Sequence, residues 1–148
     1  MQTGNRRVLN LVVATAALLA VSAISASAAT SRSADSEIVV TLGKPGELNM
    51  QTSTKSAKAG EVAFVVKNKG KLEHEFILLR TKKPGHKLPP RSDEPQKVSE
   101  PGFAAELEDI EPGHTIVLAL PLKQGHYVLL CNIEGHYAGG MRADLSLR

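Results

Sequence analysis

Cysteine is nearly absent from this chain of 148 residues, which has one, Cys131. A single cysteine excludes an intramolecular disulfide, so a domain of this size has to be held together by its hydrophobic core. In an oxidising compartment a free thiol is a liability unless it is buried, paired with another chain or used as a metal ligand. The destination of the protein therefore bears on the role of Cys131.

The first 28 residues predict export. Arg6 and Arg7 precede an almost wholly apolar run at 8–24, and the small residues of 26–28 follow it. A basic segment, an apolar segment and such a site are typical of a secretory signal peptide, here 1–28. We expect its cleavage and a periplasmic or secreted location, with an uncleaved membrane anchor as the alternative. Residues 29–36 predict a flexible tail, which leaves 37–148 as the folded domain.

An excess of charge of either sign is missing from the exported part. The whole chain has 18 lysines and arginines against 15 aspartates and glutamates, and Arg6 and Arg7 belong to the signal peptide. The remainder is close to neutral, so we expect no nucleic-acid partner.

Sustained helical periodicity is missing beyond residue 36, and short β-rich runs take its place. In one run Val62, Phe64 and Val66 alternate with their neighbours, which is typical of a strand with one buried face. Turn residues separate the runs. The pattern predicts an all-β fold, an antiparallel Greek-key β-sandwich of about seven or eight strands. The expected strands are 37–42, 47–52, 62–68, 72–80, 103–110, 114–120, 126–132 and 141–147.

A segment rich in Pro and Lys breaks this rhythm at 80–101, where we expect a long surface loop. Its basic cluster either forms a solvated face or docks an acidic partner. The cluster consists of Lys82, Lys83, Lys87 and Arg91.

Three potential metal ligands follow one another as Cys-x4-His-x4-Met: Cys131, His136 and Met141. The first ends one expected strand and the third begins the next, so the loop between them can bring all three side chains to one point. His74, at the start of an apolar strand, offers a fourth ligand from a distant part of the chain. Two imidazoles, a thiolate and a thioether form the ligand set of blue-copper sites. Structural zinc prefers four strong Cys or His ligands.

The other histidines lie outside this set. His114 and His126 each follow a turn glycine, and His86 lies in the long loop. We expect all three at the surface and none of them as a copper ligand.

With "LEHEF" at 72–76 and "YVLLCNIEGHYAGGM" at 127–141, residues 37–148 resemble the cupredoxins, the family of small blue-copper proteins that includes plastocyanin, azurin and sulfocyanin. The resemblance implies one type 1 copper, with His74, Cys131 and His136 in a near-planar trio and Met141 in an axial position. It implies single-electron transfer without enzymatic activity. The loop spacing is longer than plastocyanin's, which leaves the subfamily open.

The resemblance also implies how the site is tuned and used. Backbone N–H groups near Asn132 or after His74 are the expected donors to the Cys131 sulfur. The edge of the His136 ring is expected at the surface, inside an apolar patch that suits a transient redox partner of a monomeric protein. The patch consists of Ile133, Tyr137, Ala138 and Gly139.

Enzymatic alternatives lack the residues that they need. Leu130 and Asn132 flank Cys131, so the neighbouring His that links a blue copper to a second centre in multicopper oxidases is missing. The binuclear copper site of terminal oxidases needs two cysteines. A copper carrier or buffer in the same compartment, with the same ligands, is the open alternative to electron transfer. A metal-free β-sandwich is a third hypothesis.

Overall fold

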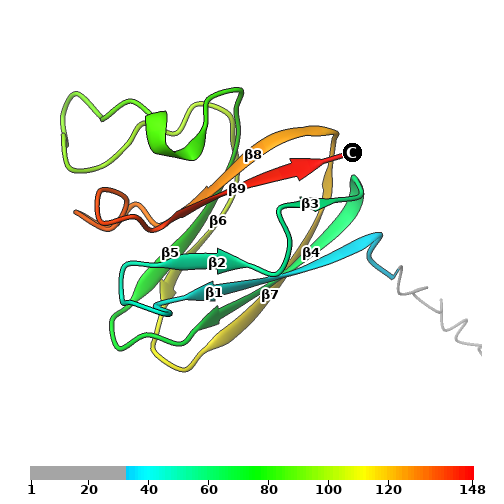
Figure 1. Ribbon diagram of the computed structural model, residues 1–148, viewed down its shortest axis with the longest axis horizontal. Coiled ribbons are helices and arrows are strands. Elements are labelled where there is room, and N and C mark those ends of the chain that lie inside the picture. Colours follow the sequence, from blue (N-terminus) through cyan, green and yellow to red (C-terminus); the bar gives the residue numbers. More distant parts are fainter. Residues whose placement is uncertain (1–32) are drawn as a thin grey trace, which may run out of the picture. The chain divides into compact units, whose positions relative to one another are not determined.

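A computed structural model describes residues 33–148 (Figure 1). The predicted signal peptide and half of the predicted tail, residues 29–32, lie outside these residues. Within the tail, Asp35 accepts hydrogen bonds from the backbone N–H of Glu61 and from the Lys58 ammonium group, and Ser36 begins the first strand. The folded part therefore begins slightly before residue 37. Among the described residues no helix is long and apolar enough to cross a membrane.

Two β-sheets make up the fold, as the alternation of apolar residues predicted. The strand order is β2-β1-β4-β7 in one sheet and β3-β9-β8-β5-β6 in the other. Each of the expected runs contains a strand, and the two-residue β3 was not expected. The strands are β1 (Ser36–Leu42), β2 (Met50–Thr52), β3 (Ser56–Ala57), β4 (Gly60–Asn68), β5 (His74–Arg80), β6 (Phe103–Ile110), β7 (Thr115–Leu122), β8 (Gly125–Leu130) and β9 (Arg142–Leu147).

The pairing differs in one respect from the purely antiparallel arrangement that we expected. β1 runs parallel to β4, with Ile38 opposite Phe64, and β3 runs parallel to β9. All other strand pairs in the two sheets are antiparallel. The alternation of inward and outward side chains is the same in both directions, so the sequence pattern does not reveal the direction of pairing.

The main core lies between the sheets. Ile38, Val40 and Leu42 of β1 are fully buried, and Phe64 of β4 meets Phe76 of β5 with ring centroids 5.3 Å apart. Full burial of such a side chain stabilises the fold by roughly 1.5–3 kcal/mol.

A second, smaller core lies on the outer face of β5 and β8. The connection between β5 and β6 is the long surface loop that we expected, but two of its residues pack onto the sheet, which was not expected. We call residues 81–101 the strap. It contains the 3-10 helix η1 (Gly85–Lys87), and it buries Leu88 and Val98 against a set of sheet residues. That set is Ile77, Leu79, Val128 and Leu130. Leu88 is followed by two prolines and Val98 stands between Lys97 and Ser99, so no periodic pattern marks them in the sequence.

Only three of the four residues in the basic cluster of the strap are exposed. Lys82, Lys83 and Lys87 are exposed. Arg91 instead forms ion pairs with Asp93 and Glu94 within the strap, at 3.1 Å each.

Candidate metal centre

The topology brings three predicted ligands to one end of the sandwich. β5 begins with His74, and it is antiparallel to β8, which ends one residue before Cys131. The loop that contains His136 follows and leads into β9. The ligand atoms of the three side chains all lie within 4.8 Å of one another. No other such group of His, Cys, Asp or Glu occurs in the part of the chain that the structure describes.

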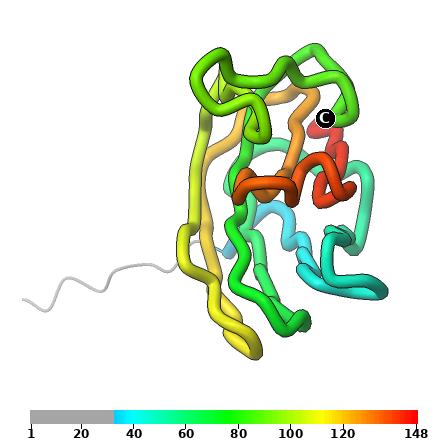
Figure 2. Tube along the Cα trace, turned by 90° about the vertical axis from the view of Figure 1, so that its left-hand side faces the viewer, coloured from blue at the N-terminus to red at the C-terminus, as the bar shows by residue number. Residues whose placement is uncertain are grey.

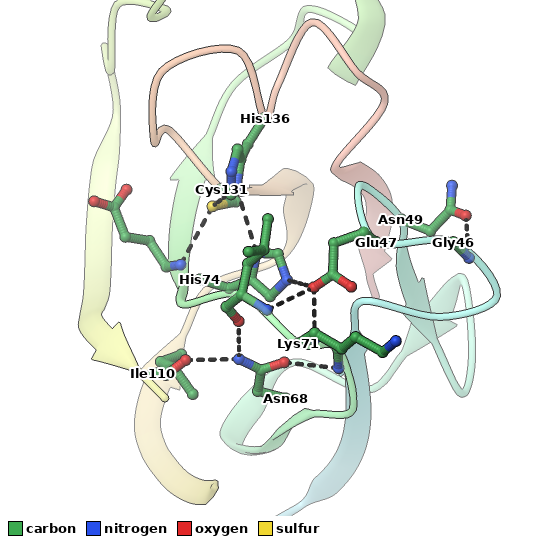
Figure 3. Close-up of polar contacts among 12 residues, drawn as sticks. Gly46, Glu47, Asn49, Asn68, Lys71, His74, Ile110, Cys131 and His136 are labelled. Carbon is green, nitrogen blue, oxygen red and sulfur yellow. Dashed lines mark hydrogen bonds and ion pairs between the residues drawn. The ribbon is translucent and has the colours of Figure 1, made fainter. Parts of the chain in front are cut away.

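The ring nitrogens and the sulfur face a common point (Figure 3). His74 Nδ1 lies 3.3 Å from His136 Nδ1, and Cys131 Sγ lies 3.3 Å from the same nitrogen. The two imidazole rings meet edge to face, with centroids 5.2 Å apart. Each histidine thus presents Nδ1 toward the cysteine sulfur.

His74 is oriented by a carboxylate that the sequence did not reveal. Its Nε2 lies 3.2 Å from Glu47 Oε1, which also accepts the backbone N–H groups of Lys71 and Leu72 (Figure 3). An ionised carboxylate only accepts, so Nε2 holds the proton and the Nδ1 lone pair points into the site. The two backbone N–H groups hold the pKa of Glu47 below its usual value, which keeps this acceptor ionised. No spacing in the sequence links Glu47 to His74.

Cys131 is fully buried, and its sulfur accepts a hydrogen bond from the backbone N–H of Glu75 at 3.2 Å. This confirms a donor from the residue after His74. Burial raises the pKa of the Cys131 thiol from an ordinary 9.0 to about 11, and the backbone N–H groups of Glu75 and Ile133 oppose the rise. The metal-free protein therefore carries a neutral thiol at pH 7, and a bound metal would have to displace its proton.

The Glu75 side chain ties the two ligand segments together. Its Oε2 accepts the backbone N–H of Asn132 at 3.2 Å, so it links the residue after His74 to the residue after Cys131. Burial raises the pKa of Glu75 above its usual value.

Both imidazoles are available as neutral ligands. Burial lowers the pKa of His74, with Glu47 opposing the change, and burial lowers the pKa of His136, with His74 as a second cause. His74 is fully buried, whereas His136 remains partly exposed. A neutral imidazole offers a lone pair to a metal, so the site is ready to bind one near pH 7.

Hydrogen bonds between backbone groups that are close in sequence close the loop that contains His136. The N–H of His136 donates to Ile133 O, and the N–H of Met141 donates to His136 O. Gly135 and Gly140 take positive φ angles of 81° and 110°, which favour glycine.

Met141 is fully buried, and its carbonyl accepts the N–H of Cys131 at 3.1 Å. This places its backbone beside Cys131, and the axial role of its sulfur stays a prediction.

The donor set fits copper. Two imidazole nitrogens and one thiolate are the strong donors of a blue-copper site. Structural zinc takes four strong donors, and within residues 33–148 no fourth His, Cys or carboxylate joins the group. The other histidines are not in this group. His126 instead bonds Thr81 O and Asp144, while His86 and His114 are exposed.

The residues of the predicted patch next to His136 are accessible at least in part. Ile133 and Tyr137 are half-buried, and Ala138 and Gly139 are exposed. Their use as a docking patch stays a prediction.

The fold and the centre together define the class of protein: a β-sandwich with a buried His–Cys–His site at one end. No protein-family model and no curated protein matches the sequence. Solved structures match the fold.

Reduced auracyanin from Roseiflexus castenholzii is 19% identical, with a TM-score of 0.57 over 79% of this chain and 99% of that chain. Rusticyanin from Thiobacillus ferrooxidans is 18% identical, with a TM-score of 0.57 over 78% of this chain and 79% of that chain. Auracyanin B is 16% identical, with a TM-score of 0.56 over 79% of this chain and 91% of that chain. The protein has the cupredoxin fold, as the motifs around His74 and Cys131 predicted.

Proposed function

We propose that this protein binds one copper ion in a type 1 site and carries single electrons. His74 Nδ1, Cys131 Sγ and His136 Nδ1 would hold the metal, with the Met141 thioether as a weak axial ligand. The observation that carries the proposal is the convergence of two imidazole Nδ1 atoms and one buried sulfur within 4.8 Å. One of the matched structures is described as the copper protein rusticyanin, and the matches include reduced forms of auracyanin and rusticyanin. These descriptions support a redox role.

Copper, when bound, would supply the one-electron chemistry, and the chain would limit how far the site rearranges. Glu47 fixes the His74 ring, and the Glu75 N–H fixes the Cys131 sulfur. Buried His74 and Cys131 exclude water from their side of the site. Ligands held in this way move little when the charge of the metal changes, which lowers the barrier to electron transfer. His136, which is partly exposed, would offer a short route for the electron to the surface.

Partners and location follow as further parts of the proposal. The patch of Ile133, Tyr137, Ala138 and Gly139 around His136 would meet a transient redox partner. The exposed lysines of the strap, Lys82, Lys83 and Lys87, would attract an acidic partner, with Arg91 engaged in its own ion pairs. The predicted signal peptide, 1–28, supports export to an extracytoplasmic compartment.

The first test is the visible spectrum of the protein from residue 29 onward, loaded with Cu(II). We expect an intense band near roughly 600 nm, the thiolate-to-copper charge-transfer region, which Cys131→Ser abolishes and Met141→Leu retains. His74→Gln should lose the band. The matched control His114→Gln should keep it, because His114 lies on an exposed turn.

The outcomes separate the candidate functions. A blue protein that exchanges electrons rapidly with a small-molecule couple supports electron transfer. A colourless protein that binds Cu(I) tightly would indicate the copper carrier instead. Absence of copper binding would refute both.

A further inference from the structure

Side-chain hydrogen bonds join the strap to the loop that carries His136 at two residues of that loop, each next to a ligand. We call residues 132–140 the ligand loop. Asn132 directly follows Cys131, and Tyr137 directly follows His136. Figures 1 and 2 show the strap beside this loop in both views.

Asn132 is bonded to the strap through every polar atom of its side chain. Its Oδ1 accepts the N–H of Val98 at 2.8 Å, and its Nδ2 donates to Val98 O at 2.9 Å and to Glu100 Oε1 at 2.7 Å. Asn132 is 4% exposed. A buried amide that donates both N–H groups and accepts at its oxygen has one low-energy orientation, which fixes the backbone next to Cys131.

Tyr137 makes the second attachment. Its hydroxyl donates to Gly85 O and accepts the N–H of Leu88 at 3.1 Å, so it bonds the first residue of η1 and the residue that follows η1. Arg142 also donates to Tyr137 O at 2.6 Å, and its guanidinium lies 5.0 Å from the ring centroid. The residue after His136 is therefore held both by the strap and by Arg142.

The strap is itself fixed to the sheet, so it can hold the ligand loop in place. Leu88 and Val98 anchor it in the second core. Near its start, the N–H of Gly85 donates to Asp144 Oδ1 at 2.8 Å, and the Asp144 carboxylate also lies 2.8 Å from His126 Nε2. A mobile strap could not hold the ligand loop in one conformation. This strap is fixed to β5, β8 and β9, so its bonds to Asn132 and Tyr137 can restrain the ligand loop.

We propose that the strap is a brace that holds the ligand loop in its metal-binding conformation before any metal is bound, with Asn132 and Tyr137 as positioning residues. The ligand loop needs such support because it contains Gly135, Gly139 and Gly140, and glycine leaves the backbone many alternative conformations. The brace is a property of the metal-free chain. Its consequence, slower release of copper, rests on the proposed function.

The two tyrosines of the chain provide a matched test. Tyr137→Phe removes the bonds to the strap. Tyr127→Phe removes one bond of similar kind, which the Tyr127 hydroxyl donates to Lys123 O at 2.8 Å. Lys123 precedes the first residue of β8, whereas Cys131 follows the last residue, so this bond lies away from the metal centre. Each net hydrogen bond corresponds to roughly a fivefold change in an equilibrium. In the metal-free protein we expect amide hydrogen exchange at His136 and Met141 to accelerate roughly fivefold to thirtyfold in Tyr137→Phe.

In Tyr127→Phe the same amides should exchange at the unaltered rate. After copper loading, Tyr137→Phe should release the metal to a chelator faster by a similar factor. Asn132→Ser is a second variant with the same expected direction.

The possible outcomes test the brace, its role in metal retention and the proposed function separately. Unchanged exchange of these amides in both Tyr137→Phe and Asn132→Ser would overturn the brace. Equal acceleration in Tyr137→Phe and Tyr127→Phe would overturn it too, because the effect would then be general loss of stability. Faster exchange with an unchanged rate of copper release would overturn the role in metal retention. Faster exchange in a protein that never binds copper would support the brace and refute the proposed function.

Discussion

Metal binding should release one proton from Cys131 across the neutral pH range. Burial raises the pKa of the Cys131 thiol to about 11, so almost all metal-free molecules are protonated at pH 7. The thiolate is the form that binds metal. Four pH units separate 7 from 11, and at about 1.4 kcal/mol each the metal has to offset about 5 kcal/mol to displace the proton.

This displacement gives the affinity a defined dependence on pH. Between pH 7 and about 10 the logarithm of the apparent affinity should rise by about one per pH unit, since one proton leaves for each metal bound. The rise should become steeper only at acidic pH, where the imidazoles of His74 and His136 also become protonated. The pKa of each imidazole is lowered, so this change lies below the usual histidine range.

Co(II) is a suitable probe, because thiolate ligation gives it an absorption band and it does not oxidise the thiol. Competition against a chelator at several pH values gives the slope, and calorimetry in buffers of different ionisation enthalpy counts the protons released. Cys131→Ser should bind Co(II) weakly and without this proton. Release of well under one proton at pH 8 would refute the reasoning, because the buried thiol would then already be ionised.

The raised pKa of Cys131 also predicts how the free energy of unfolding of the metal-free protein depends on pH. Below pH 9 the thiol is protonated in both the unfolded and the folded chain, and its full contribution to stability is present. Between pH 9 and about 11 the unfolded chain loses the proton while the folded chain keeps it, so stability falls by up to about 3 kcal/mol. Urea denaturation at pH 8 and at pH 10.5 should show this fall in the natural protein. The same comparison in Cys131→Ala should lack it, whereas equal falls would contradict the assigned pKa.

Two further predictions concern residues away from the sulfur. Leu88→Ala should lower the free energy of unfolding by about 3 kcal/mol, because it leaves a cavity in the second core. The control Val117→Ala, at a side chain 64% exposed, should change it by less than about 0.5 kcal/mol in chemical denaturation; equal small losses would show that the strap is not packed. Glu47→Ala should weaken copper affinity roughly 10–100-fold in competition assays. Glu47→Gln should weaken it less, since its oxygen still accepts from Lys71 and Leu72, and unaltered affinity in Glu47→Ala would contradict a role in orienting His74.

Much of the fold was predictable because it is encoded locally. The alternation of Val62, Phe64 and Val66 marks a strand with one buried face whatever its partner, and the structure places all three in the core. The parallel pairing of β1 with β4 was not predictable, because alternation has no direction. The packing of Leu88 and Val98 was missed because neither belongs to an alternating or periodic run of apolar residues.

The sequence by itself determined the kinds of ligand and the elements that hold them. A lone cysteine, a histidine and a methionine at even spacing lie between two strand patterns, and His74 begins another, so convergence at one end follows once those strands pair. Only the tertiary structure decided most of what surrounds the ligands. The carboxylate of Glu47 on His74 and the attachments of the ligand loop to the strap join residues far apart in the chain. Such contacts depend on how strands and connections pack in three dimensions, and local periodicity does not contain that information.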